Sequence, residues 1–409
     1  MRIVFGTSLI PPPPARGLSA SGQIGIVDLA GWWALGRGLA GGSLPWRIRA
    51  LLVDHLTGWG QNLPEVTVNA HSTPGATVFS IAGPNLAGEG TLPIPAHAEP
   101  MRLNFSRIEL APLVHLVQPG SQPPNPDEIP ALDLTSARTD YGKMHLGQVT
   151  LVLRDAGTHT LLIPRFKMKS PDLDVTGAGR WSRASGHSRV VLSLRLTSGH
   201  LSRAFRQLAL TPPMTAHNAD VTLALHWHGL PWHPDPESVG GQIGFRFKNG
   251  RVFSLKPGGA GRFIALFSLN ALPRRLGLDF SDVFSRGLAY DQLTGDFALS
   301  RGVARTRNVE LFGPSIALWM TGEANLAKRS YDQVALVVPH VGSTLPIAGM
   351  IFGGPVGGGI MLAVSRIFQG LIENMTEAYY HISGSWSHPV VKRIGDEQAR
   401  ALGFVKPHP

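Results

Sequence analysis

Four side chains between positions 226 and 235 have the types and spacing of a metal site. His226 and His228 alternate along an expected strand, so both imidazoles point to one face, and His233 and Asp235 follow closely. That face is the polar one, where solvated histidines are common on a strand exterior. We therefore interpret the cluster as surface and expect no metal ion.

Three carboxylates in the last third of the chain have the chemistry of an acid–base pair. These are Asp279, Asp282 and Asp291. Asp282 also suits the N-cap of a short helix, and Arg274 and Arg275 offer counter-charges nearby. Capping and ion pairing are favoured over catalysis at these positions.

A glycine-rich turn at residues 258–262 (Gly-Gly-Ala-Gly-Arg) precedes a helical pattern, as in loops that bind phosphate through backbone N–H groups. It lacks the lysine and the Ser/Thr of a P-loop, and the glycine run at 353–359 lacks lysine as well. The chain has no G-x-S-x-G motif and no cysteine, which excludes a nucleophile elbow and thiolate chemistry. We expect neither enzyme activity nor a cofactor.

Composition gives the chain a formal net charge of +10, with arginines spread along it rather than gathered into basic blocks. Such a charge predicts an anionic partner, and the absence of basic blocks favours phospholipid headgroups or a membrane surface over nucleic acid. The absence of cysteine is compatible with an oxidising compartment. The 48 glycines and 33 prolines favour many short elements joined by turns. The N-terminus, with its proline run at 11–14, lacks a secretory signal.

The dominant sequence period is two, which indicates strands with one apolar and one polar face. The clearest alternating runs lie at 190–196, 220–228 and 243–248, and Asn249-Gly250 predicts a hairpin turn after the last of them. The N-terminal part gives a weaker signal, with short strands expected at 67–69 and 77–81. One set of alternate residues forms the predicted apolar face: Val190, Leu192, Leu194, Leu196, Val221, Leu223, Leu225, Trp227, Ile243, Phe245 and Phe247.

These strands predict a mainly β fold, an elongated, twisted antiparallel sheet curled into an open hydrophobic groove. A continuous apolar face must be covered by another layer or by a ligand, and amphipathic helices long enough to cover it are scarce between residues 130 and 256. Acyl chains would suit the uncovered face, because burial stabilises each methylene by ~0.8 kcal/mol without a specific site. An ordinary sandwich or barrel core remains the alternative interpretation of the periodicity.

The chain divides by composition into a β-rich part (1–117), a proline-rich loop (118–129), β-groove repeats (130–256), a C-terminal region (257–394) and a flexible tail (395–409). Short helices are expected at 259–290 and 345–378, and a final strand at 379–383. Residues 344–365 form a 22-residue window without charge, long enough to span a membrane. Its glycines and prolines favour an interfacial or capping helical hairpin instead.

Small motifs follow one another in a fixed order along the last third of the chain, such as Ala271-Leu272-Pro273-Arg274-Arg275 and Gly384-Ser385-Trp386-Ser387-His388-Pro389. This order resembles the C-terminal region of YhdP-type AsmA-like proteins, a Gram-negative envelope family similar to bridge-like lipid-transfer proteins. The matching positions, to which we assign structural roles, are Gly261, Arg262, Pro273, Arg274, Arg275, Asp279, Phe280, Asp282, Asp291, Asp332, Gly354, Pro355, Gly384, Trp386 and Pro389.

The resemblance implies a non-catalytic function, phospholipid transfer between the inner and outer membranes along a hydrophobic β-groove. It also implies a place in the periplasm or cell envelope, with a membrane anchor in the full-length family that this chain lacks. Expected partners are phospholipids, membrane surfaces and envelope proteins. The alternative function is a structural or interaction module for envelope assembly that conducts no lipid. An outer-membrane barrel is disfavoured by a short helical insert expected at 32–44 and by the irregular proline-rich connections.

Overall fold

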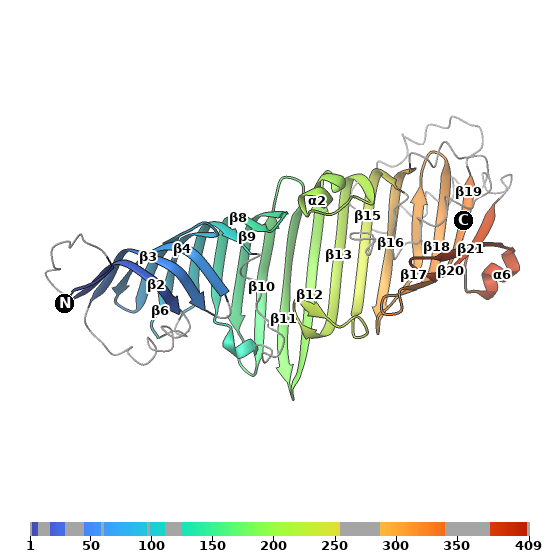
Figure 1. The fold of residues 1–409 in the computed structure, drawn as a ribbon. Helices are drawn as coiled ribbons and strands as arrows, with labels where there is room; N and C mark the ends of the chain where they lie inside the picture. The colour runs from blue at the N-terminus through green and yellow to red at the C-terminus, as the bar shows by residue number, and fades with distance from the viewer. Residues whose placement is uncertain are drawn as a thin grey trace. The chain divides into compact units, whose positions relative to one another are not determined.

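The computed structural model describes residues 2–6, 17–28, 45–58, 61–95, 99–110, 125–253, 287–339 and 377–406. Strands make up most of these residues (Figure 1). The chain divides into two compact units. Unit 1 comprises Met1–Leu194 with Gln207–Ala209 and His228–His233, and unit 2 comprises Arg195–Arg206, Leu210–Trp227 and Pro234–Pro409.

Unit 1 is an open sheet in which each strand pairs with the next along the chain from β1 to β11. Its strands are β1 (Arg2–Phe5), β2 (Leu18–Asp28), β3 (Trp46–Gly58), β4 (Gln61–Thr73), β5 (Ala76–Ala82), β6 (Leu86–Pro93), β7 (Met101–Glu109), β8 (Leu132–Tyr141), β9 (Met144–Asp155), β10 (Thr160–Lys169), β11 (Asp174–Ala184) and most of β12 (His187–Ser198). A short 3-10 helix, η2 (Pro126–Glu128), precedes β8.

The expectation of a wholly antiparallel sheet was wrong at three ladders of unit 1. β1 pairs with β2, β2 with β3, and β7 with β8 in parallel. In each case more than ten residues separate the two strands, enough for the chain to return to the start of the next strand. The other ladders of this unit join strands separated by at most seven residues, and these are antiparallel.

Unit 2 contains a second run of paired strands, and the described ladders within it are all antiparallel. They join β13 (Met214–Leu230), β15 (Gly240–Val252), β16 (Leu288–Ser300), β17 (Val303–Phe312), β18 (Ile316–Asn325), β19 (Ser330–Pro339), β20 (Ala378–Ser385) and β21 (Pro389–Ile394) in chain order. β14 (His233–Pro234) is a two-residue strand. The mainly β, open-sheet fold expected from the sequence is therefore confirmed.

Asn249-Gly250 is not the hairpin turn that its sequence predicts. β15 continues through both residues, with Gly250 opposite Ala216 on one side and Tyr290 on the other. Asn249 has no partner in either ladder and adopts a φ of 49°. The strand register is the same on both sides of Asn249, so the dipeptide lies inside a continuous strand, and asparagine tolerates the left-handed conformation found there.

Two α-helices lie in the described part of the chain. α2 (Leu201–Gln207) follows β12, and α6 (Asp396–Ala401) follows β21. α6 occupies part of the segment expected to be a flexible tail, so that expectation was wrong for residues 396–401. The predicted helices at 259–290 and 345–378 fall mostly outside the described residues, and where they enter them, at 288–290 and 378, the chain is strand. The final strand expected at 379–383 is β20.

Three clusters of buried apolar residues form the cores, one in unit 1 and two in unit 2. One lies in unit 1 on β3–β7 and includes Val53 and Val66, each 1% exposed. A larger one covers one face of the unit 2 sheet and includes Leu311 and Leu318, both fully buried. On the opposite face of β18–β20, α6 and the residues after it complete the third cluster, through Ala399 and Phe404 (Figure 1). The C-terminal part of unit 2 is thus buried on both faces of its sheet.

Candidate functional site

One row of apolar residues crosses eleven consecutive strands of unit 1. Directly paired residues on neighbouring strands point to the same face of a sheet. Following the register from β1 to β11 therefore identifies one continuous line on one face, here called the long row. Its members are Ile3, Ala20, Ile48, Ala70, Phe79, Gly90, Leu103, Leu134, Leu151, Phe166 and Gly177.

The opposite face of the same strands carries a polar row at adjacent positions. From β4 to β11 its members are Asn69, Ser80, Glu89, Asn104, Thr135, Thr150, Lys167 and Thr176. Thr150, for instance, precedes Leu151 in β9, and the two side chains point to opposite faces. The sheet of unit 1 is therefore two-sided over at least eight strands.

The side chains of the long row are mostly intermediate between buried and exposed. Nine of its eleven residues are half-buried, and only Ala70 and Gly90 are buried. Ten interstrand steps of about 4.8 Å give the row a length of roughly 48 Å. One acyl chain spans about 15 Å, half the hydrocarbon core of a bilayer. The row could therefore contact more than one lipid along its length.

Unit 2 has a corresponding row, and all its members except the half-buried Ala378 are buried. Ala219, Phe247, Leu293, Leu311, Leu318, Val337 and Ala378 lie opposite one another in succession. Leu293, Leu311 and Leu318 are at most 1% exposed. Half-buried apolar positions in unit 2 lie instead on β13 and at the start of β15. There Val221 is opposite Phe245, and Leu223 is opposite Ile243.

The eleven residues predicted to form the apolar face are described in full, and they divide by exposure. Four are buried, namely Val190, Trp227, Phe245 and Phe247. Seven are half-buried, namely Leu192, Leu194, Leu196, Val221, Leu223, Leu225 and Ile243. The intervening Ser193, Arg195 and Thr222 are exposed. Within unit 1, Leu194 lies against Gly177 of the long row.

Sequence reasoning missed the long row, all of which precedes β12. The signal was present in the alternation of Ala70, Phe79 and Leu103 with polar neighbours. Glycine at position 90 interrupts that pattern, because a glycine contributes no apolar side chain to a count of alternating residues. Only the strand register shows that Gly90 belongs to the same row.

Tyr290 and Gln333 place polar groups on the buried face of the unit 2 sheet. The Tyr290 hydroxyl donates a hydrogen bond of 2.6 Å to the carbonyl oxygen of Thr215, and burial raises the pKa of this phenol. Gln333, fully buried, lies opposite Gly322 and Ile382. Tyr290 therefore stays a neutral donor at physiological pH.

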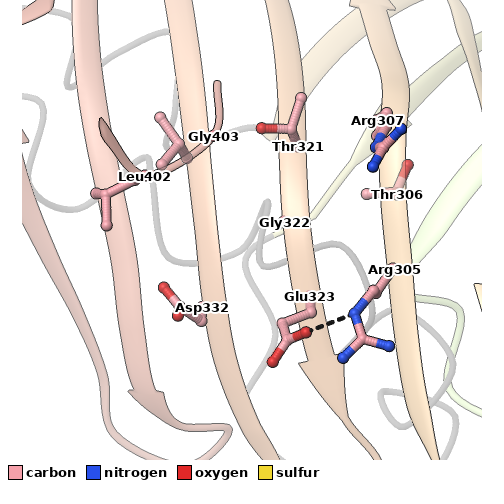
Figure 2. A pocket seen from close by; sticks show the side chains of 10 residues that line it. Arg305, Thr306, Arg307, Thr321, Gly322, Glu323, Asp332, Leu402 and Gly403 are labelled. Atoms are coloured by element: carbon pink, nitrogen blue, oxygen red, sulfur yellow. Dashed lines mark ion pairs between the residues drawn. The ribbon is translucent and has the colours of Figure 1, made fainter. Parts of the chain in front are cut away.

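A cavity of about 250 Å³ opens beside the third cluster, on the face of β17–β19 that α6 covers (Figure 2). Arg305 Nε and Glu323 Oε2 are 2.9 Å apart at its edge, and Asp332 beside them contacts His381 Nε2 at 2.8 Å. Leu402 and Gly403, after α6, complete the lining. Glu323 and Asp332 lie directly opposite each other in the β18–β19 ladder, and each carboxylate has a basic partner, Arg305 and His381 respectively.

The other candidates from the sequence are dispersed. Among the described residues no three His, Asp or Glu side chains lie close enough to hold a metal ion. Asp291 lies in β16, and Gly384 and Pro389 flank the turn between β20 and β21. Trp386 packs against Tyr331, with ring centroids 6.2 Å apart. The remaining motif positions lie outside the described residues: Gly261, Arg262, Pro273, Arg274, Arg275, Asp279, Phe280, Asp282, Gly354 and Pro355.

The described helices are all too short or too polar to cross a bilayer. The uncharged window at 344–365 lies outside the described residues.

Comparison with known proteins gives one family and one characterised relative. A sequence model of the family described as YhdP protein matches residues 1–391. The intermembrane phospholipid transporter YhdP of Escherichia coli (strain K12) is 28% identical over 220 residues, which is 54% of this chain and 17% of the relative. The match thus spans less than a fifth of that protein. No solved structure matches.

Proposed function

Because the chain belongs to the YhdP family, we propose that its half-buried apolar residues bind the acyl chains of phospholipids and so contribute to phospholipid transfer between the inner and outer membranes. The chain would act without catalysis, in the periplasm of a Gram-negative envelope. The name of the Escherichia coli relative, an intermembrane phospholipid transporter, supports the choice of ligand.

The observation that carries the proposal is the sidedness of unit 1. An apolar row crosses eleven strands, and a polar row lies on the other face of eight of them, β4 to β11. The long row is half-buried, so its side chains retain surface that a ligand can cover. Burial of ten methylenes at ~0.8 kcal/mol each would stabilise a bound chain by about 8 kcal/mol before entropic costs. No headgroup-specific contact is needed for that stabilisation.

Site-specific photocrosslinking tests this proposal. A photoreactive amino acid is placed at Leu151 of the long row and, separately, at Thr150 of the polar row. A second pair uses Leu194 and the exposed Ser193 of β12. Cells are labelled with radioactive phosphate so that crosslinked phospholipid appears as a labelled protein band.

We expect labelled adducts at Leu151 and Leu194. At Thr150 and Ser193 the labelling should not exceed background. Equal labelling within each pair would exclude a one-sided lipid path. The absence of adducts at all four positions would favour the alternative function, an envelope-assembly module that carries no lipid.

A further inference from the structure

One stretch of the chain has an unusual charge pattern. Residues 175–219 contain six arginines and three histidines and neither aspartate nor glutamate. Within the part of this stretch that belongs to unit 2, Arg195 is paired with Asp220. Arg203 and Arg206 are exposed and form no ion pair with the described part of the chain. Two uncompensated guanidinium groups therefore lie on one short helix, α2.

The opposite side of α2 packs on the apolar face of unit 2. Ala204 is 2% exposed, and Leu201 contacts the cluster that includes Phe245 and Phe247. Residues three apart lie on the same side of a helix, so Leu201 and Ala204 face inward while Arg203 and Arg206 face outward. Figure 1 shows α2 at the ends of β12 and β13.

Two imidazoles extend this basic surface. The rings of His200 and His217 lie 6.1 Å apart, and both side chains are exposed. His200 directly precedes α2, and His217 lies near the start of β13. We call His200, Arg203, Arg206 and His217 the α2 rim. Val221 and Leu225, which follow His217 by four and eight residues in β13, are half-buried and pack against the same cluster as Leu201.

We propose that the α2 rim binds the phosphate of a phospholipid whose acyl chains lie against the half-buried residues of β13. This inference rests on the proposed function. A lipid on an apolar surface must keep its phosphodiester at the polar border, and the rim places two arginines there. Arginine binds phosphate through paired N–H donors, and neither Arg203 nor Arg206 has an ion-pair partner among the described residues.

The test compares two fluorescent lipids with the same acyl chains, a phosphatidylglycerol and a diacylglycerol, which lacks the phosphate. Their Kd values for the whole chain are measured by fluorescence anisotropy. The variant is Arg203→Gln/Arg206→Gln. The matched control is Arg165→Gln/Arg246→Gln, which removes the same charge from exposed positions on β10 and β15.

We expect the wild-type chain to bind phosphatidylglycerol more tightly than diacylglycerol. The α2 variant should bind phosphatidylglycerol about tenfold more weakly, which is the loss expected when one charge-assisted hydrogen bond is removed. Its affinity for diacylglycerol should not change. The control variant should retain the preference, and added salt should reduce it.

Three results would count against the idea, and they are distinguishable. A preference that survives in the α2 variant would overturn the assignment of the rim alone. Displacement of phosphatidylglycerol by inorganic phosphate at millimolar concentration would show a phosphate site that does not depend on acyl chains. Failure of the wild-type chain to bind either lipid would instead refute the proposed function on which the inference rests.

Discussion

Phe79 lies directly opposite Gly90 in the β5–β6 ladder, and its ring fills the space that a side chain at position 90 would need. A Cβ atom added to Gly90 would lie 2.6 Å from Phe79 Cζ and 2.7 Å from Leu103 Cδ2. Gly177 is also a close-packed glycine of the long row, but its near neighbour is on the next strand, where a Cβ would lie 2.4 Å from Leu194 Cδ2. At both positions a large side chain occupies the space beside a glycine.

Replacing Gly90 with alanine should destabilise unit 1, because Phe79 and Leu103 would have to move away from the added methyl group. We expect the free energy of unfolding to fall by about 1–3 kcal/mol, the usual cost of overpacking. Urea unfolding followed by circular dichroism measures this. Gly25 of β2 is the matched control, since a Cβ there meets no atom within 4 Å. Equal losses for Gly90→Ala and Gly25→Ala would show that backbone freedom, and not space for the ring, explains the glycine.

Much of the sheet could be predicted from the sequence because its strands follow the period of two. The runs at 190–196, 220–228 and 243–248 lie within β12, β13 and β15. The rest depended on facts that local sequence does not contain. The parallel ladders follow from which strand the chain returns to after a long connection, and the assignment of Gly90 to an apolar row follows from strand register.

The candidate site was predicted in part for a related reason. Alternation places Leu192, Leu194 and Leu196 on one face, but it does not distinguish a half-buried residue from a fully buried one. Phe245 and Phe247 have the same alternation and are buried, because they belong to the cluster that continues through β16–β20. Likewise, the segment after Gly395 reads as a polar tail, yet Ala399 and Phe404 provide contacts that hold it on the sheet.

A charge at Leu223 should separate a ligand-binding position from an ordinary core position. Leu223 is half-buried, so the carboxylate of Leu223→Asp can reach water, and we expect the fold to persist while lipid binding falls by at least about tenfold. Leu311→Asp, at a fully buried position, should unfold the protein. Ala224→Asp, on the exposed alternate position of the same strand, should change neither property. Circular dichroism and binding of a fluorescent phospholipid give the two readouts, and unfolding of Leu223→Asp would identify this residue as plain core.

The C-terminal segment should stabilise unit 2 through one aromatic contact. Phe404 is 3% exposed and packs edge-to-face on Tyr379, with ring centroids 5.5 Å apart. Phe404→Ala should lower the free energy of unfolding by about 3–5 kcal/mol, as expected for a buried aromatic residue. Val405 is 69% exposed, and Val405→Ala should have almost no effect. Thermal unfolding of both variants makes the comparison, and similar melting temperatures for the two would mean that the segment does not pack as described.

Acid should weaken unit 1 through Asp140, whose side chain lies in a small polar cluster. Burial of the carboxyl raises its pKa, but contacts of 2.7 Å with His145 Nδ1 and Arg138 Nε outweigh this and hold the pKa below its usual 3.8. A carboxyl whose pKa is lower in the folded state contributes stability above the unfolded pKa. That contribution disappears as the pH falls through the folded pKa.

Asp140→Asn should therefore destabilise the protein by about 1.5–3 kcal/mol at neutral pH, the range for hydrogen bonds to a charged group. The difference between wild type and variant should shrink below about pH 4, as the wild-type carboxylate becomes protonated. Urea unfolding at a series of pH values measures the difference. Asp174→Asn, at an exposed position on β11, serves as the control and should cost little at any pH. A difference for Asp140→Asn that stays constant from neutral pH to pH 3 would mean that the ionised carboxylate is not what stabilises this cluster.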